Sequence, residues 1–117
     1  MHRSREVTVA PRHEEDVLET IRPLSMQCRE GVLMVEEELE ANDPDIDERC
    51  GLLADRFEVY AVRIPGCRGF RLAVSMDLRS GSPPAAALHG AVPARRACDA
   101  ARRLATRHRD LIDPAWE

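Results

Sequence analysis

The sequence predicts a single α+β domain over residues 1–117, with a small antiparallel sheet and helices packed on one face of it. Its 117 residues match the usual length of one domain. Two segments alternate between apolar and polar residues, and an apolar stripe with helical spacing lies near the end of the chain. Apolar residues make up 44% of the sequence but aromatic residues only 3%, so we expect an aliphatic core.

The start of the chain predicts a strand followed by two helical segments. Residues 6–10 alternate in polarity before Pro11, which cannot donate to a sheet ladder, so we expect a short strand. Apolar residues with helical spacing begin at Val17 and continue to Leu39, with an interruption at Pro23. This pattern predicts either a kinked helix or a helical hairpin.

A third, short helix is expected over residues 44–54. Asp43 is a residue type that caps helix N-termini, and Pro44 is favoured at the first helical position. Apolar residues then recur at a spacing compatible with a helix, at Ile46, Cys50 and Leu53.

The clearest pattern in the chain is a β-hairpin. Residues 57–64 and 70–78 are rich in strand-forming residues, and they flank a Pro65–Gly69 segment with turn residues at both ends. The second strand alternates strictly, which predicts one buried face and one largely polar face. We expect the alanine-rich face of the last helix to cover the buried one, and Tyr60 to pack there.

The last third of the chain predicts a loop and a long helix. Residues 79–93 are read as a loop, in which residues 85–92 form at most one weak strand. Pro93 is expected to open the last helix and Pro114 to end it. His108 lies on the apolar stripe of this helix and is interpreted as a core histidine, whereas His89 is expected in the loop.

Charge divides the chain into two opposite halves. All 17 basic residues are arginine, which codon bias explains most simply, and the formal net charge is −4. Residues 1–60 hold 16 acids and 7 arginines, a balance of −9, whereas residues 61–117 hold 5 acids and 10 arginines, a balance of +5. The halves either attract each other within the fold or present surfaces to different partners. The acidic candidates for partner binding are Glu36, Glu37, Glu40, Asp45 and Asp47.

Arginines near the hairpin turn form the main candidate site. Pairing Ile64 with Phe70 would place Arg63 opposite Arg71, with Arg68 between them, and such a group of guanidinium ions can bind phosphate or another anion. In the alternative, the register differs and the three arginines point separately into solvent.

The last helix supplies a second set of candidates. These are Arg95, Arg102 and Arg103, on a basic face that could follow phosphates. The alternative is a solvated face, because Asp99 lies four residues from both Arg95 and Arg103 and could pair with either.

Neither a metal nor a cofactor is predicted. Cys28, Cys50, Cys67 and Cys98 lie far apart without a Cys-x-x-Cys pair, so we expect free buried thiols. The sequence contains no common catalytic motif, and no apolar stretch is long enough to cross a bilayer. We therefore expect a cytoplasmic protein without a membrane partner.

Two functions follow as hypotheses. The first is a small intracellular protein-interaction or regulatory module without catalytic activity, which binds a partner protein or a second copy of itself. For the second, the element order and the hairpin arginines resemble small ribonuclease toxins of the RelE and ParE type. That resemblance implies a nucleic-acid-directed protein in which Arg63, Arg68 and Arg71 bind phosphate and a histidine or acid assists proton transfer.

Overall fold

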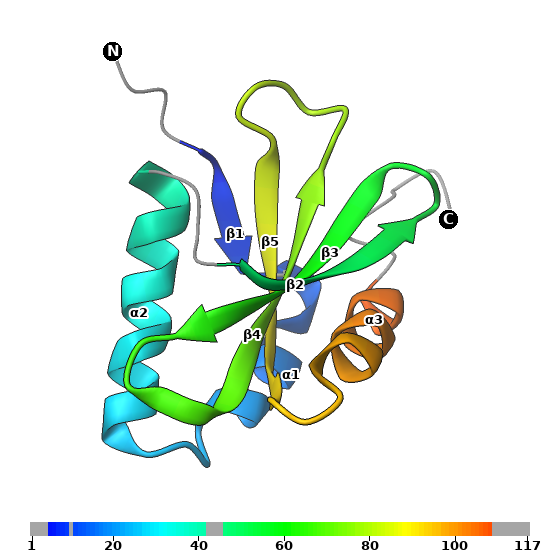
Figure 1. The fold of residues 1–117 in the computed structure, drawn as a ribbon. Helices are drawn as coiled ribbons and strands as arrows, with labels where there is room; N and C mark the ends of the chain where they lie inside the picture. The colour runs from blue at the N-terminus through cyan, green and yellow to red at the C-terminus, as the bar shows by residue number, and fades with distance from the viewer. Residues whose placement is uncertain (1–4, 10, 42–45, 109–117) are drawn as a thin grey trace.

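A five-stranded sheet with three α-helices confirms the predicted α+β class (Figure 1). The computed structural model describes residues 5–9, 11–41 and 46–108, and within them the side chains of all residues except 11, 46 and 47. The strands are β1 (Val7–Val9), β2 (Ile46–Leu53), β3 (Phe57–Ile64), β4 (Cys67–Asp77) and β5 (Ala85–Pro93). The helices are the 3₁₀-helix η1 (Pro11–His13) and the α-helices α1 (Glu14–Ile21), α2 (Met26–Ala41) and α3 (Ala97–Arg107).

The sheet is mixed and not wholly antiparallel as predicted. Its strand order is β1-β5-β4-β3-β2, and β1 pairs with β5 in parallel while the other neighbours are antiparallel. All three other pairs join strands that are consecutive in the chain. Because the whole helical and hairpin region separates β1 from β5, no tight turn requires these two strands to run in opposite directions.

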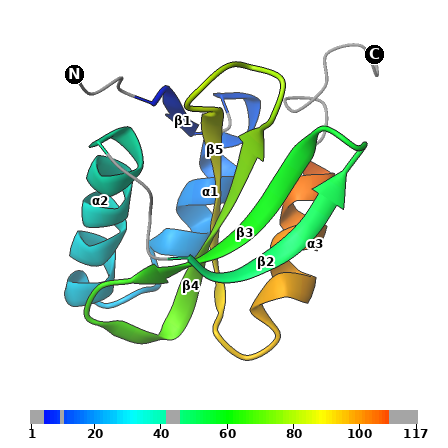
Figure 2. The ribbon, with the colours of Figure 1, turned by 45° about the horizontal axis from the view of Figure 1, so that its top comes forward.

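Helices cover both faces of the sheet, which corrects the prediction of one covered face. Val35 and Leu39 of α2 pack on the face that contains Val74, whereas Ala101 of α3 packs on the face that contains Ala73 (Figure 2). The reason is that β3 is apolar on both faces, so each face requires a cover. The face of β4 that we expected to be largely polar is therefore also covered, and Ala73 and Ser75 on it are buried.

The alanine-rich face of α3 therefore covers a different row of β4 from the one we expected. It packs against small residues, among them Ala61 and Ala73, and not against the row of Leu72 and Val74 that α2 covers. Small side chains on both surfaces let a helix approach a sheet closely. This explains why α3 packs on the row of Ala61 and Ala73. Tyr60 is buried as predicted, under α2.

Residues 46–53 form strand β2, so the prediction of a short third helix is wrong. β2 pairs with β3 along its length, and the hairpin turn between them places Ala54 and Asp55 at φ 53° each. Two successive positive φ values are typical of the turns that join antiparallel strands. Pairing with β3 supplies backbone hydrogen bonds that a helix this short could not replace with comparable packing. The proposed cap at residues 43 and 44 lies outside the described residues.

The weak strand expected over residues 85–92 is β5, and it lies inside the sheet between β1 and β4. Pro93 is its last residue and does not open a helix, because α3 begins only at Ala97. His89 lies in this strand and not in a loop, and it is fully buried. His108 is also fully buried, which confirms its interpretation as a core histidine.

The two apolar stripes before residue 41 belong to separate helices. α1 ends at Ile21, and the short break before Met26 contains Pro23. The hydroxyl oxygen of Ser25 accepts a hydrogen bond from the backbone N–H of Cys28 at 3.2 Å, so it caps the N-terminus of α2. Among the residues that the structure describes, no helix is long and apolar enough to span a membrane.

All four cysteines form disulfides, which corrects the prediction of free thiols. Cys28 of α2 bonds Cys67 at the start of β4, and Cys50 of β2 bonds Cys98 of α3. The partners are 39 and 48 residues apart in sequence, so their spacing could not reveal the pairing. Each bond connects the sheet to a helix.

Candidate anion-binding site at the hairpin tip

The register of the β3–β4 hairpin places two arginines side by side. Arg63 and Arg71 are direct partners across the strands, as predicted, but Ile64 pairs with Cys67 and not with Phe70. The difference arises because the connection is the two-residue turn Pro65-Gly66, so the segment 68–70 bulges out of β4. Gly66 has a φ of 73°, which a residue with a side chain rarely adopts.

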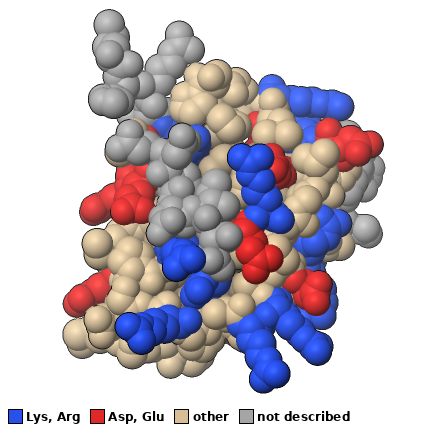
Figure 3. Space-filling view, viewed as in Figure 1, with Lys and Arg blue, Asp and Glu red and all other residues tan. Residues whose placement is uncertain are grey.

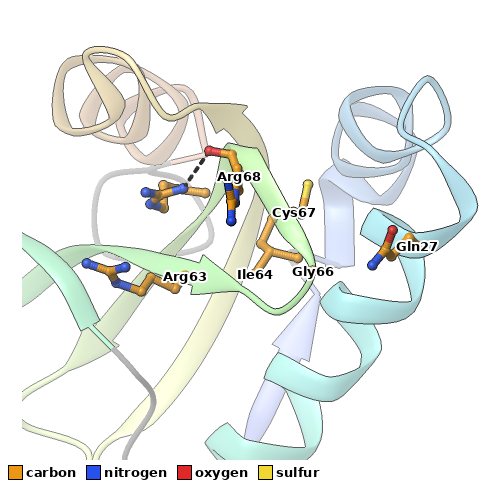
Figure 4. A pocket seen from close by; sticks show the side chains of 7 residues that line it. Gln27, Arg63, Ile64, Gly66, Cys67 and Arg68 are labelled. Atoms are coloured by element: carbon orange, nitrogen blue, oxygen red, sulfur yellow. Dashed lines mark hydrogen bonds between the residues drawn. The ribbon is translucent and has the colours of Figure 1, made fainter.

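Residues around this tip line an open pocket of about 850 Å³. Figure 4 shows Arg63 and Arg68 on one side of the hairpin and Gln27, from the first turn of α2, on the other. The pocket is lined by Gln27, Arg63, Ile64, Gly66, Cys67, Arg68 and Arg71. The structure thus brings together the three arginines that the sequence singled out as one group.

The hairpin tip is fixed to α2 by a covalent bond and by close packing. The Cys28–Cys67 disulfide joins the two elements, and Cys67 itself lines the pocket. A side chain at Gly31 would collide with the carbonyl oxygen of Pro65, and one at Gly66 would meet the amide of Gln27. Because the tip rests on a helix, the positions of the arginine backbones are set before any ligand binds.

Arg71 is held in place by the bulge itself. Its Nη1 atom donates to the carbonyl oxygens of Arg68 and Phe70, at 3.1 and 3.0 Å. The first of these bonds is the dashed line in Figure 4. Arg71 is half-buried, whereas Arg63 and Arg68 are exposed. These two bonds hold the positively charged guanidinium group of Arg71 at the pocket. They also fix the orientation of its other nitrogen atoms.

Two further arginines lie next to the bulge, in the loop between β5 and α3. The backbone N–H of Ala94 donates to the carbonyl oxygen of Gly69 at 2.9 Å, which holds this loop against the hairpin. Arg95 and Arg96 follow directly and are exposed. Figure 3 shows basic side chains gathered along the lower part of this face, where Figure 1 places the hairpin tip and the loop. Arg96, at a φ of 61°, lies before the first residue of α3, so it is not on the face of the last helix where its sequence position had placed it.

Arg102 has a structural role, in contrast to its predicted place on a binding face. Its Nη1 atom donates to the carbonyl oxygens of Cys50 and Leu52, at 2.9 and 3.3 Å. These contacts join α3 to the edge strand β2. Arg103 is exposed on the same helix.

The acidic candidates are only partly described. Glu37 and Glu40 are exposed on the C-terminal half of α2, and Glu36 is half-buried there. Burial and the neighbouring Glu40 raise the pKa of Glu36 above its ordinary value. Asp45 lies outside the described residues, and Asp47 belongs to β2. This group therefore stays a prediction.

The pocket offers positive charge and hydrogen-bond donors. Within the described part of the chain, no histidine or carboxylate lines it, and no group of three or more potential metal ligands occurs. Such an arrangement can bind and orient an anion, but the described lining residues supply no group that would transfer a proton near pH 7.

Comparison with known proteins adds nothing to this geometry. No protein-family model matches the chain, and neither a curated protein nor a solved structure matches it. The resemblance to RelE and ParE toxins therefore remains a hypothesis, and the function has to be argued from the site alone.

Proposed function

We propose that the protein is a non-catalytic interaction module that receives an acidic segment of a partner protein at its arginine-lined hairpin tip. One observation carries this proposal: Arg63, Arg68 and Arg71 line a single pocket on a tip that is anchored to α2. Guanidinium groups bind carboxylates with two parallel hydrogen bonds, and a preorganised site avoids part of the entropy cost of binding.

The lining residues favour binding over catalysis. General acid–base catalysis needs a titratable group within hydrogen-bond reach of the substrate. His89 and His108 are fully buried and do not line the pocket. This supports a partner that is bound and released unchanged.

Net charge and composition favour a protein partner over a nucleic acid. The whole chain carries −4, which opposes the approach of a long polyanion, whereas a short acidic segment can reach the local positive charge. Proteins that bind single strands use exposed aromatic residues for base stacking. Among the aromatic residues that the structure describes, Phe57 and Tyr60 are buried, and Phe70 packs against the core.

A labelled glutamate-rich peptide provides the test, with binding followed by fluorescence anisotropy at low and physiological salt. We expect the double variant Arg63→Ala, Arg71→Ala to lose about tenfold or more in affinity, which corresponds to about 1.4 kcal/mol. The matched control is Arg22→Ala, Arg79→Ala, which removes the same charge from exposed positions away from the pocket. Equal losses in the two double variants, or no binding by the wild-type protein at low salt, would overturn the proposal.

A nucleic-acid-directed protein, with a ribonuclease activity like that of RelE and ParE toxins, is the second candidate. It is favoured by Arg95 and Arg96, because they extend the positive charge beyond the pocket toward a longer anion. It requires salt-dependent binding of RNA that is lost in the Arg63→Ala, Arg71→Ala variant. Absence of RNA binding at low salt excludes it.

Compartment and self-association are part of the same proposal. A cytoplasmic location is what the sequence predicts, whereas two disulfides are typical of oxidising compartments. Alkylation of thiols at the moment of cell lysis, followed by mass spectrometry, decides between them: four alkylated cysteines support the cytoplasm.

Light scattering at several protein concentrations tests whether the partner is a second copy of the chain.

A further inference from the structure

A continuous chain of hydrogen bonds runs through the interior, away from the hairpin pocket. The Oγ atom of Ser75 lies 2.7 Å from Nε2 of His89, whose Nδ1 lies 3.0 Å from Nδ1 of His108. Nε2 of His108 lies 2.6 Å from a carboxylate oxygen of Asp16. The serine and both histidines are at most 2% exposed, whereas the Asp16 side chain is 28% exposed. The chain thus leads from the sheet to the surface.

A bulge in β5 directs His89 into this chain. Gly90 pairs with Ala73 and Leu88 with Val74, so His89 is the extra residue between the two pairs. Gly90 has a φ of 135°, and a side chain there would collide with Thr20. The hydroxyl oxygen of Thr20 accepts a hydrogen bond from the N–H of Ala91 at 2.8 Å, which fixes the bulge against α1.

The partners determine which ring nitrogen atoms carry hydrogen. The hydrogen bond from His108 holds the pKa of Asp16 below its ordinary value, so Asp16 is a carboxylate and only accepts. His108 therefore donates from Nε2 and, as a neutral ring, accepts at Nδ1. His89 must then donate from Nδ1 and accept at Nε2, where the Ser75 hydroxyl donates. All the hydrogen bonds point toward Asp16.

We infer that the His89–His108 pair is a binding site for one proton, and that proton uptake reverses the hydrogen bonds between Ser75 and His108. After uptake, His108 carries hydrogen on both nitrogen atoms and donates from Nδ1 to Nδ1 of His89. His89 then carries its hydrogen on Nε2 and donates to the Ser75 oxygen. The chain gains one proton from solvent, and the resulting imidazolium lies against the Asp16 carboxylate.

Charged and titratable neighbours act on this site from η1, α1 and α3. Asp16 favours the protonated form of His108, whereas His13, stacked on His108 at a centroid distance of 4.5 Å, and Arg107 oppose it. Burial opposes it most strongly, and it holds the pKa of His108 below its ordinary value. Burial together with His108 and His13 lowers the pKa of His89 to about 3. Because Asp16 faces His108 and not His89, the added charge belongs on His108.

Nitrogen-15 NMR of the histidine rings tests the inference directly. Near neutral pH we expect His89 to be hydrogenated at Nδ1 and His108 at Nε2. On acidification, His108 should become doubly protonated while His89 changes to the Nε2–H form in the same titration step. The inference is overturned if His89 keeps its Nδ1 hydrogen while His108 titrates, or if the protein unfolds before His108 titrates.

Variants separate proton binding from a merely structural network. Asp16→Asn should lower the pH midpoint of the His108 step by about one unit, because it removes the carboxylate that faces the imidazolium. His13→Ala should raise it, because the His13 ring stacked on His108 opposes the protonated form, and this variant serves if Asp16→Asn does not fold. Glu19→Gln is the matched control on the exposed surface of α1 and should leave the midpoint unchanged. An unchanged midpoint in His13→Ala or in a folded Asp16→Asn would contradict the inference.

Discussion

Arg102 lies with its Nη1 atom 2.9 Å from the carbonyl oxygen of Cys50, beside the disulfide that joins Cys50 to Cys98. One helix thus holds the edge strand β2 by a covalent bond and by a charged hydrogen bond. Gly51, between the two carbonyl groups that Arg102 contacts, has a φ of 96°, and a Cβ atom there would lie 3.0 Å from Nη1. A contact of this kind stabilises the fold, and Arg102, unlike Arg71, does not line the pocket at the hairpin tip.

We therefore expect Arg102→Ala to lower the free energy of unfolding by about 1–3 kcal/mol, the usual value for a hydrogen bond to a charged group. Urea denaturation measures this change. Arg103→Ala, one position along the same helix and exposed, should change stability by less than about 0.5 kcal/mol. Neither variant should alter peptide binding at the hairpin tip, and a loss of binding in Arg102→Ala at full folding would show that its side chain contributes to the site.

The two disulfides should have similar effects on stability and different effects on binding. Replacing either pair with serine opens a loop of similar length, 39 or 48 residues, and should lower the free energy of unfolding by about 2–4 kcal/mol. Only Cys28→Ser, Cys67→Ser should also weaken binding of the acidic peptide, because this bond anchors the arginine pocket to α2. Denaturation curves and anisotropy titrations on both variants provide the comparison, each serving as the control for the other. If both variants bound the acidic peptide equally well, the Cys28–Cys67 disulfide would not be needed to hold the arginine pocket in shape.

Local patterns in the sequence were sufficient for the hairpin and for its arginine pair. The alternating residues on each side of the turn favour the register that places Arg63 opposite Arg71, and the structure contains this pair. The same local logic failed for residues 46–53, where apolar residues at Ile46, Cys50 and Leu53 fit a helix as well as a strand. Pairing with β3, the next strand in the chain, decided the outcome, because the periodicity of so short a segment does not distinguish a strand from a helix.

The disulfides and the histidine chain could not be predicted, because they depend on contacts between distant segments. His108 and Asp16 are 92 residues apart in sequence. Cys98 lies next to Cys50 because α3 packs on the second face of the sheet. A bulge that redirects His89 has no distinct pattern beyond the glycine that follows it. Sequence reasoning could identify His108 as buried, but not what it contacts.

Buried neutral histidines make stability depend on pH in a defined direction. The pKa of His89 is about 3 in the folded protein and about 6.5 in an unfolded chain, so below pH 6.5 the unfolded state binds the additional proton. The stabilisation from His89 is thus complete above pH 6.5 and is lost as pH falls toward 3. We expect a slope of about 1.4 kcal/mol per pH unit from His89, measured by urea denaturation across this range. His89→Gln should flatten that slope, and an unchanged slope would assign it to other groups.

The close approach of the hairpin tip to α2 yields the sharpest test of the site's rigidity. Replacing a helical glycine with alanine normally stabilises a helix by up to about 1 kcal/mol. At Gly31 the added methyl group would instead collide with the carbonyl oxygen of Pro65 and with Ile64, so we expect Gly31→Ala to destabilise the fold by about 1–3 kcal/mol. The displaced tip should also bind the acidic peptide more weakly. Gly69→Ala is the control, since no atom lies within 4 Å of its Cβ position, and it should leave stability nearly unchanged. The prediction is contradicted if Gly31→Ala is as stable as Gly69→Ala and binds the peptide normally. The hairpin tip could then move away from α2 without loss of stability or of peptide binding.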